Sequence, residues 1–79
     1  MKATSIYEKA VTYVRTYAEP RMVANAQKQL ATTNKSLGDI DENLECEVID
    51  LMEEYGAEHG FGEGWWENYG TAEDIVRVL

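Results

Sequence analysis

Apolar side chains recur at the spacing of an α-helix in three separate stretches of this chain. In residues 40–55 they share one side of a helix that turns about 100° per residue, and acidic side chains cover the opposite side. The apolar set is Ile40, Leu44, Val48, Leu51, Met52 and Tyr55. Three such stripes can be buried only against one another or against a second copy of the chain. The pattern therefore predicts an all-α fold.

The first two helices are expected on either side of Pro20. A capping box of Ser5 and Glu8 predicts that the first helix begins there and runs over about residues 6–18. Its apolar arc comprises Ile6, Ala10, Tyr13, Val14 and Tyr17. Pro20 ends this helix and suits the first position of the next. A narrower stripe, Met22, Val23, Ala26 and Leu30, predicts a second helix over about residues 21–32, antiparallel to the first.

Glycine positions set the expected ends of the remaining elements. Gly38 is expected to close the second helix in the left-handed conformation, Asp39 to cap the third, and Gly56 to end it. Residues 56–70 then hold five of the six glycines and four of the eight aromatic residues, which is typical of a loop with one turn at 65–69. Residues 72–79 fit a short helix or a terminal strand, and no second strand is evident to pair with them. We expect one domain over residues 1–79: a small three-helix bundle with a Gly/aromatic-rich segment and a short C-terminal helix.

Several functional classes are excluded at this stage. A chain of 79 residues has room for one modest core, so a deep substrate cavity is not expected. Cys46 is the only cysteine, which excludes an internal disulfide. His59 is the only histidine, and no second group is signalled that would complete a catalytic site with it. We therefore predict no enzymatic activity, no cofactor and no metal, and the lack of an apolar leader or span predicts a cytoplasmic protein.

Two stretches of the chain carry side chains of the kinds that bind metal ions. Residues 39–50 resemble a calcium loop in their oxygen ligands, but Leu44 replaces the glycine of the sharp turn and Asp50 replaces the final glutamate. His59 with Glu58 and Glu63 remains a third functional class, a small metal- or ligand-binding protein. A change in melting temperature with a divalent ion would support it.

The charge is divided unevenly along the chain, whose net charge is −8. Residues 1–38 carry six basic and two acidic side chains, whereas residues 39–79 carry thirteen acidic side chains and one basic. One interpretation is a solvated acidic face, partly neutralised by the basic half; the other is a docking surface for a basic protein partner. Direct binding of nucleic acid is not expected, because it normally requires a basic patch.

The leading hypothesis is a non-enzymatic protein-interaction or regulatory module. Its partner would contact the acidic face of the third helix and the exposed aromatic residues of the following segment, since tryptophan and tyrosine are enriched at interface hot spots. The predicted binding residues are Glu42, Glu47, Asp50, Glu53, Glu54, Phe61, Trp65, Trp66 and Tyr69. In the other interpretation of this segment, one tryptophan plugs the core and the two tryptophans divide the roles.

The alternative function is an inhibitor that mimics nucleic acid and blocks a DNA- or RNA-binding protein, of the kind that phages and mobile elements encode. Carboxylates along a helix would then replace backbone phosphates. A homodimer is left open by Ile49, which lies outside the main apolar arc of its helix, together with Met22, Met52 and the two adjacent tryptophans. No membrane partner is expected.

Overall fold

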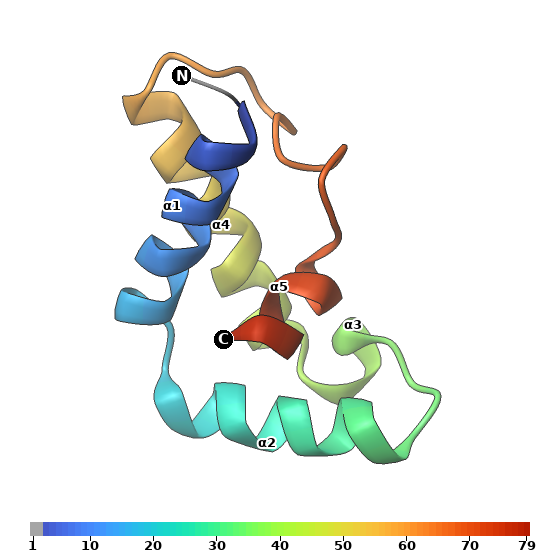
Figure 1. Ribbon diagram of the computed structural model, residues 1–79. Helices are drawn as coiled ribbons and strands as arrows, with labels where there is room; N and C mark the ends of the chain where they lie inside the picture. The colour runs from blue at the N-terminus through green and yellow to red at the C-terminus, as the bar shows by residue number, and fades with distance from the viewer. Residues whose placement is uncertain (1–2) are drawn as a thin grey trace.

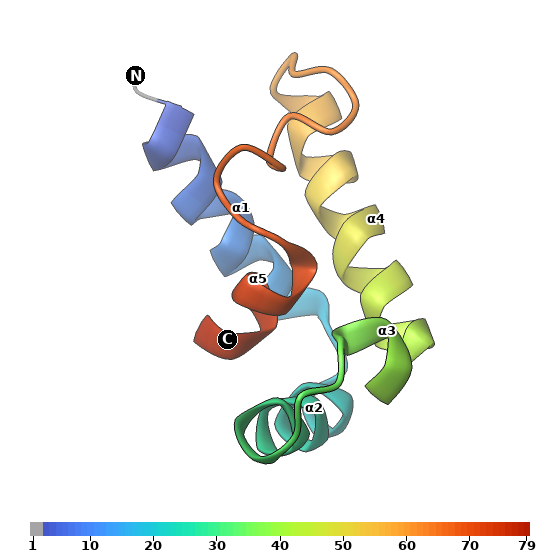
Figure 2. The ribbon, with the colours of Figure 1, turned by 90° about the vertical axis from the view of Figure 1, so that its right-hand side faces the viewer.

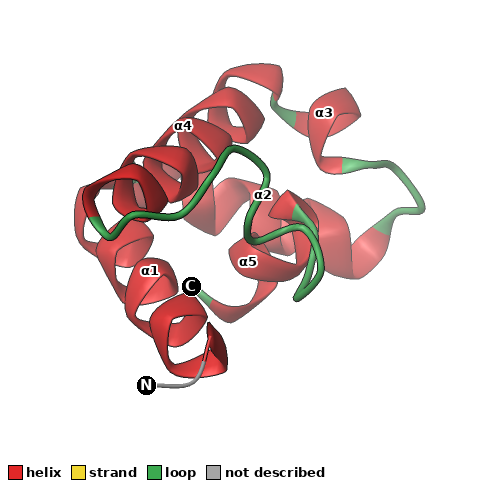
Figure 3. Ribbon diagram, turned by 90° about the horizontal axis from the view of Figure 1, so that it is seen from above, coloured by secondary structure: helices red, strands yellow, loops and turns green. Residues whose placement is uncertain are grey.

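The computed structural model describes residues 3–79, and all regular structure in this range is helical (Figure 3). The five helices are α1 (Ala3–Tyr17), α2 (Pro20–Thr32), α3 (Leu37–Ile40), α4 (Glu42–Glu58) and α5 (Ala72–Val78). The predicted all-α class is confirmed, and so is the choice of a helix for the C-terminal segment. No helix in residues 3–79 has the length and apolar character needed to cross a membrane.

The two longest helices, α1 and α4, pack side by side and run in opposite directions (Figures 1 and 2). The side chains of Val14, Val48 and Met52 are fully buried, as the apolar stripes predict. The helix α1 begins at Ala3, so Ser5 lies inside it and the predicted capping box is wrong. Nothing in the preceding residues prevents an earlier start, because neither glycine nor proline precedes Ser5.

The second helix is not the antiparallel partner of the first. Figure 1 shows α2 crossing below the ends of α1 and α4, and it packs against α5 and α3. Glu19 lies in the short turn between α1 and α2 and is held extended before Pro20 (φ −64°, ψ 116°). Its side chain caps α2 by accepting a hydrogen bond from Arg21 N. The α2 stripe of Val23, Ala26 and Leu30 is buried as predicted. The simple three-helix bundle is therefore replaced by five helices with α2 lying crosswise.

The expected single helix from residue 39 is divided in two. Ser36 caps α3 and Asp41 caps α4, with the Asp41 carboxylate accepting from Leu44 N at 3.1 Å. Asp41 itself is extended (φ −157°, ψ 91°), which breaks the helix between α3 and α4. Gly38 lies inside α3 and does not have the positive φ that the prediction required; the described glycines with positive φ are Gly60 and Gly64. The buried Leu37 explains the early turn, since α3 places it in the core.

The C-terminal helix is central to the core. Ile75 and Val76 are fully buried, and α5 packs against both α4 and α2. Thr71 and Asp74 form a capping box: Asp74 N donates to Thr71 Oγ1 at 3.2 Å, and Thr71 N donates to the Asp74 carboxylate at 3.0 Å. Figure 2 shows the segment between α4 and α5 leaving the end of α4, crossing toward α1 and returning to the centre of the molecule. This path places the aromatic segment against both long helices.

Candidate functional site

The predicted acidic face lies on the solvent side of α4. Glu42, Asp50 and Glu54 are exposed and Glu47 is half-buried. The side chains of Glu42, Glu47 and Asp50 make no hydrogen bond or ion pair with the described part of the chain. The basic side chains of residues 3–38 therefore do not pair with these three carboxylates, which remain a negative surface.

Glu53 belongs to the same predicted set but has a different environment. Its carboxylate accepts hydrogen bonds from Gly64 N at 2.9 and 3.1 Å and from Trp66 Nε1 at 3.0 Å. A carboxylate that accepts three hydrogen bonds stabilises the backbone it holds, because hydrogen bonds to charged groups are the stronger ones. Glu53 thus fastens the aromatic segment to α4.

The two tryptophans divide the roles, as one interpretation of the sequence proposed. Trp66 is buried, with 4% of its surface exposed, so it is not the exposed contact that the predicted site requires. Trp65 is half-buried; its Nε1 donates to the Met52 carbonyl oxygen at 3.0 Å, and its ring stacks on Phe61 at a centroid distance of 5.1 Å. Tyr69 is 41% exposed and lies 5.4 Å from the ring of Tyr7. Tyr69 is therefore the exposed aromatic of the predicted set, and Phe61, like Trp65, is half-buried.

Gly56 explains how Trp65 reaches α4. This glycine is buried inside the helix, which continues to Glu58 instead of ending at Gly56 as predicted. A Cβ atom at this position would collide with the Trp65 indole. Gly56 is therefore retained in a helix, where glycine is unfavourable, because the indole occupies the space of its side chain.

A second aromatic surface, which we call the aromatic row, runs along the seam of α1 and α4. It consists of Tyr17, Tyr13, Tyr55 and His59, with consecutive ring centroids 4.7, 5.4 and 4.3 Å apart. The sequence assigned the three tyrosines to apolar stripes, but Tyr17 is 61% exposed and the other two are half-buried. The signal was present: each pair of rings on one helix is four residues apart and so lies on one side of it.

Two carboxylates of α4 border the aromatic row. The pKa of the Tyr13 hydroxyl is raised above its ordinary value, first by partial desolvation, then by a hydrogen bond to Glu54 and by the negative charges of Glu54 and Glu58. Both of these acidic side chains are exposed. The row therefore combines accessible aromatic faces with negative charge.

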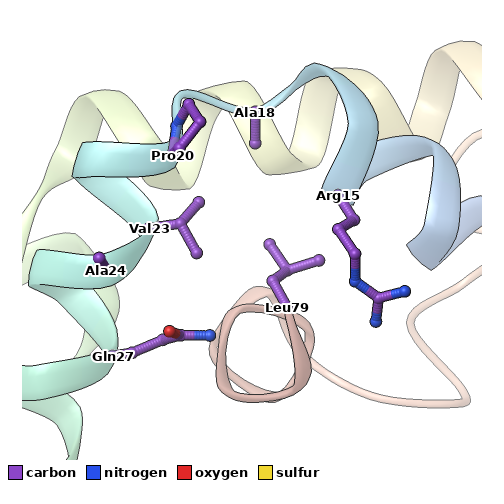
Figure 4. A pocket seen from close by; sticks show the side chains of 7 residues that line it. All are labelled: Arg15, Ala18, Pro20, Val23, Ala24, Gln27 and Leu79. Atoms are coloured by element: carbon purple, nitrogen blue, oxygen red, sulfur yellow. The ribbon is translucent and has the colours of Figure 1, made fainter.

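A shallow cavity of about 220 Å³ lies where α1, α2 and the C-terminal residues meet (Figure 4). Its lining is Arg15, Ala18, Pro20, Val23, Ala24, Gln27 and Leu79. The two polar side chains bind α5: Arg15 Nη2 donates to the Val78 carbonyl oxygen at 3.0 Å, and Gln27 Nε2 donates to that of Val76 at 2.8 Å. Figure 4 shows Leu79 between the two helices. These contacts attach the C-terminus to α1 and α2.

The remaining candidates are dispersed. Within residues 3–79, no three His, Cys, Asp or Glu side chains are grouped so that they could hold a metal ion. The residues compared with a calcium loop form the end of α3 and the first half of α4. Cys46 is exposed. No family model, curated protein or solved structure matches this chain.

Proposed function

We propose that this protein is a non-enzymatic interaction module that binds a basic protein partner through the acidic face of α4. The observation that carries the proposal is that Glu42, Glu47 and Asp50 have no partner in the described part of the chain. Carboxylates without a hydrogen-bond or ion-pair partner in residues 3–79 are free to meet cations on another molecule. The negative field of unpaired carboxylates accelerates the encounter with a positively charged protein surface and disfavours negatively charged partners.

The aromatic contribution to this binding is narrower than the sequence suggested. Glu53 and Trp66 hold the segment in place, so we assign them a positioning role and leave Phe61, Tyr69 and the edge of Trp65 as contacts. These residues lie on the segment that Glu53 fastens to α4, so a partner would contact an apolar surface near the acidic face. Such a combination suits a protein partner, whose surface carries both kinds of group.

The spacing of the carboxylates favours a basic protein over mimicry of nucleic acid. Glu47, Asp50, Glu54 and Glu58 follow one another at three or four residues, which is about 4.5–6 Å of helix axis per charge. Each strand of duplex DNA presents one charge per about 3.4 Å of axis. The single stripe is thus about one and a half times sparser than the strand it would replace. An inhibitor of a DNA- or RNA-binding protein remains the second candidate, supported by the single line of charges.

A capture experiment tests the proposal. The tagged protein is incubated with lysate of its native host at low and high salt, beside an E47Q/D50N variant and a matched E8Q/E19Q variant that loses the same charge away from α4 and the aromatic segment. We expect one basic protein to be captured by the wild type and the matched variant, with binding weakened by salt and by E47Q/D50N. Calorimetry with the purified partner then gives its affinity.

The other outcomes are informative. Capture of a DNA- or RNA-binding protein that nucleic acid displaces would support the mimic. Binding that is insensitive to salt and to E47Q/D50N, but is lost in Y69A, would assign the contact to the aromatic segment and contradict the acidic-face model. Equal loss in both charge variants would mean that net charge alone is responsible.

A further inference from the structure

We infer that the aromatic row, with Glu54 and Glu58 beside it, is a binding site for an arginine side chain of the basic partner. This inference rests on the proposed function and names the chemistry of one contact within it. The site lies on the α1–α4 seam, outside the aromatic segment of residues 61–69.

The geometry of the row provides a continuous aromatic surface. Its rings come from two helices, and neighbouring rings are tilted by 36–52° at centroid distances of 4.3–5.4 Å. Rings at these separations are in contact, so no solvent layer divides them. Tyr17 at one end is 61% exposed and His59 at the other is exposed, so solvent reaches the row at both ends. A planar group can lie on such a surface without displacing a core residue.

The charge beside the row determines what that planar group is. A cation over an aromatic face is attracted by the negative π-cloud, and the attraction grows when carboxylates stand at the edge. Glu54 and Glu58 lie one helical turn apart on α4, and both act on the Tyr13 hydroxyl. An anion or a neutral apolar side chain would meet repulsion or unpaired carboxylates here.

Arginine fits this combination better than lysine. Its guanidinium is flat, stacks on aromatic rings and presents several N–H donors in its plane, so one group can stack on the row and bond a carboxylate at once. A lysine ammonium is a compact and strongly hydrated charge that gains less from the ring faces. The same site should therefore rank arginine above lysine, and lysine above an uncharged analogue.

A titration followed by NMR tests this ranking. The probes are blocked short peptides of one sequence that carry arginine, lysine or citrulline, and the readout is the ring signals of Tyr13, Tyr17 and Tyr55. We expect saturable shifts with the arginine peptide, weaker binding of the lysine peptide and none of the citrulline peptide. The Y17A substitution should weaken arginine binding about two- to five-fold, because it removes one exposed cation–π contact.

A pair of charge variants locates the site. E54Q/E58Q should weaken binding about tenfold, since each exposed ion pair contributes up to about a factor of five. The matched D39N/E67Q variant loses the same charge at two exposed positions, on α3 and in the segment after α4, outside both the row and the acidic face, and should bind as the wild type does. Circular dichroism of each variant verifies that the fold is retained; Tyr17 is exposed enough that Y17A should keep it.

Three results would overturn the inference: ring shifts of equal size with citrulline, shifts centred outside the row, or equal weakening by the two charge variants. None of these touches the proposed function, which is decided by E47Q/D50N in the capture experiment. If the aromatic row does not bind arginine while E47Q/D50N loses its partner, the acidic face binds without an arginine site. If the row binds arginine while no partner is captured, the site stands and the proposed function does not.

Discussion

Glu53 and Glu54 are neighbours in sequence and have opposite uses. Glu53 is half-buried and accepts three hydrogen bonds from the aromatic segment, whereas Glu54 is exposed beside the aromatic row. A helix turns about 100° between them, which is enough to place one carboxylate against the chain's own backbone and the other at the α1–α4 seam. The same residue type therefore supports the fold on one side of α4 and a candidate contact on the other.

The two aromatic regions differ in the same way. On the Glu53 side, the indole N–H groups of Trp65 and Trp66 are both bonded to α4, and Trp66 is buried. On the Glu54 side, the rings lie against one another and Tyr17 remains 61% exposed. Bonded and buried aromatics stabilise a fold, while accessible ones are available to a partner. The difference separates the aromatic residues that support the fold from those that are candidate contacts more clearly than their number does.

Replacing Gly56 by alanine should give the largest effect on the Glu53 side. The added Cβ collides with the Trp65 indole, which is itself held by the Met52 carbonyl, so the ring must move. We expect a loss of about 2–3 kcal/mol in the free energy of unfolding, measured with urea. In an ordinary helix, replacing glycine by alanine stabilises the protein by about 1 kcal/mol. A loss of stability would therefore by itself indicate the collision with Trp65.

The matched control is Gly62→Ala. Gly62 has open space around its Cβ position and no positive φ, so this variant should lose no stability. Equal stability of G56A and the wild type would show that Trp65 does not need this contact. The proposal that the aromatic residues on the Glu53 side of α4 support the fold would then fail.

Exchanging each glutamate of the pair for glutamine tests the comparison directly. E53Q keeps one carbonyl oxygen but loses the charge that accepts from Gly64 N and Trp66 Nε1, and we expect a loss of about 1–2 kcal/mol. E54Q alters an exposed side chain, and its effect should stay within about 0.5 kcal/mol. Urea unfolding followed by tryptophan fluorescence measures both. Similar losses in the two variants would remove the distinction.

Much of the fold is predictable from the sequence because periodicity reports burial. The stripes of α2 and α4 identify Val23, Leu30, Leu44 and Val48, all of which are buried. Pro20 likewise places the start of α2, because its ring fits only the first turn of a helix. These features depend on residues close together in the chain.

The misplaced elements depend on contacts between distant residues. The helix breaks at Asp41 because Leu37 is buried, and α4 continues past Gly56 because this glycine packs against Trp65. The helix propensities of the neighbouring residues indicate neither feature. The crosswise position of α2 has the same origin, because α2 packs against α5, which lies far along the chain.

The candidate site was predictable only in part. The acidic face of α4 follows from charge and period, and Glu42, Asp50 and Glu54 are exposed as expected. The aromatic row was missed because tyrosine was counted as apolar, although its ring can lie half-exposed with a polar tip in water. The use of Glu53 could not be foreseen, since its donors lie 11 and 13 residues away in a segment without regular period.

Asp74 shows that exposure alone does not identify a functional carboxylate. It is exposed as Glu54 is, yet it has structural partners as Glu53 does, in Thr71 and Arg77. The Asp74→Ala variant should lose about 1 kcal/mol at neutral pH, because the capping box of α5 is broken. Thermal unfolding followed by circular dichroism measures this loss, with Glu67→Ala as an exposed control that should change little.

The pH dependence of this loss has a definite sign. Hydrogen bonds from Thr71 and the charge of Arg77 lower the Asp74 pKa below its ordinary value of 3.8. The folded state therefore binds the proton less readily than the unfolded state, so the stabilisation is present above that value and disappears as the pH falls below it. The difference between wild type and Asp74→Ala should shrink in acid. A difference that persists undiminished at low pH would mean that ionised Asp74 is not the capping group.

The smallest expected effect is on the pKa of Tyr13, on the Glu54 side of α4, and it appears only at alkaline pH. Desolvation, the hydrogen bond to Glu54 and the nearby negative charges raise the pKa of Tyr13 above 10.0, so the folded state keeps this proton longer than the unfolded state. The associated stabilisation is present below that pH and is lost as the pH rises through the folded-state pKa. Ultraviolet titration of tyrosinate should show a lower Tyr13 pKa in E54Q and no change in E53Q, with Y13F identifying the signal. If E53Q shifted it as much as E54Q, the two sides of α4 would share one electrostatic environment, and an arginine would have no reason to choose between them.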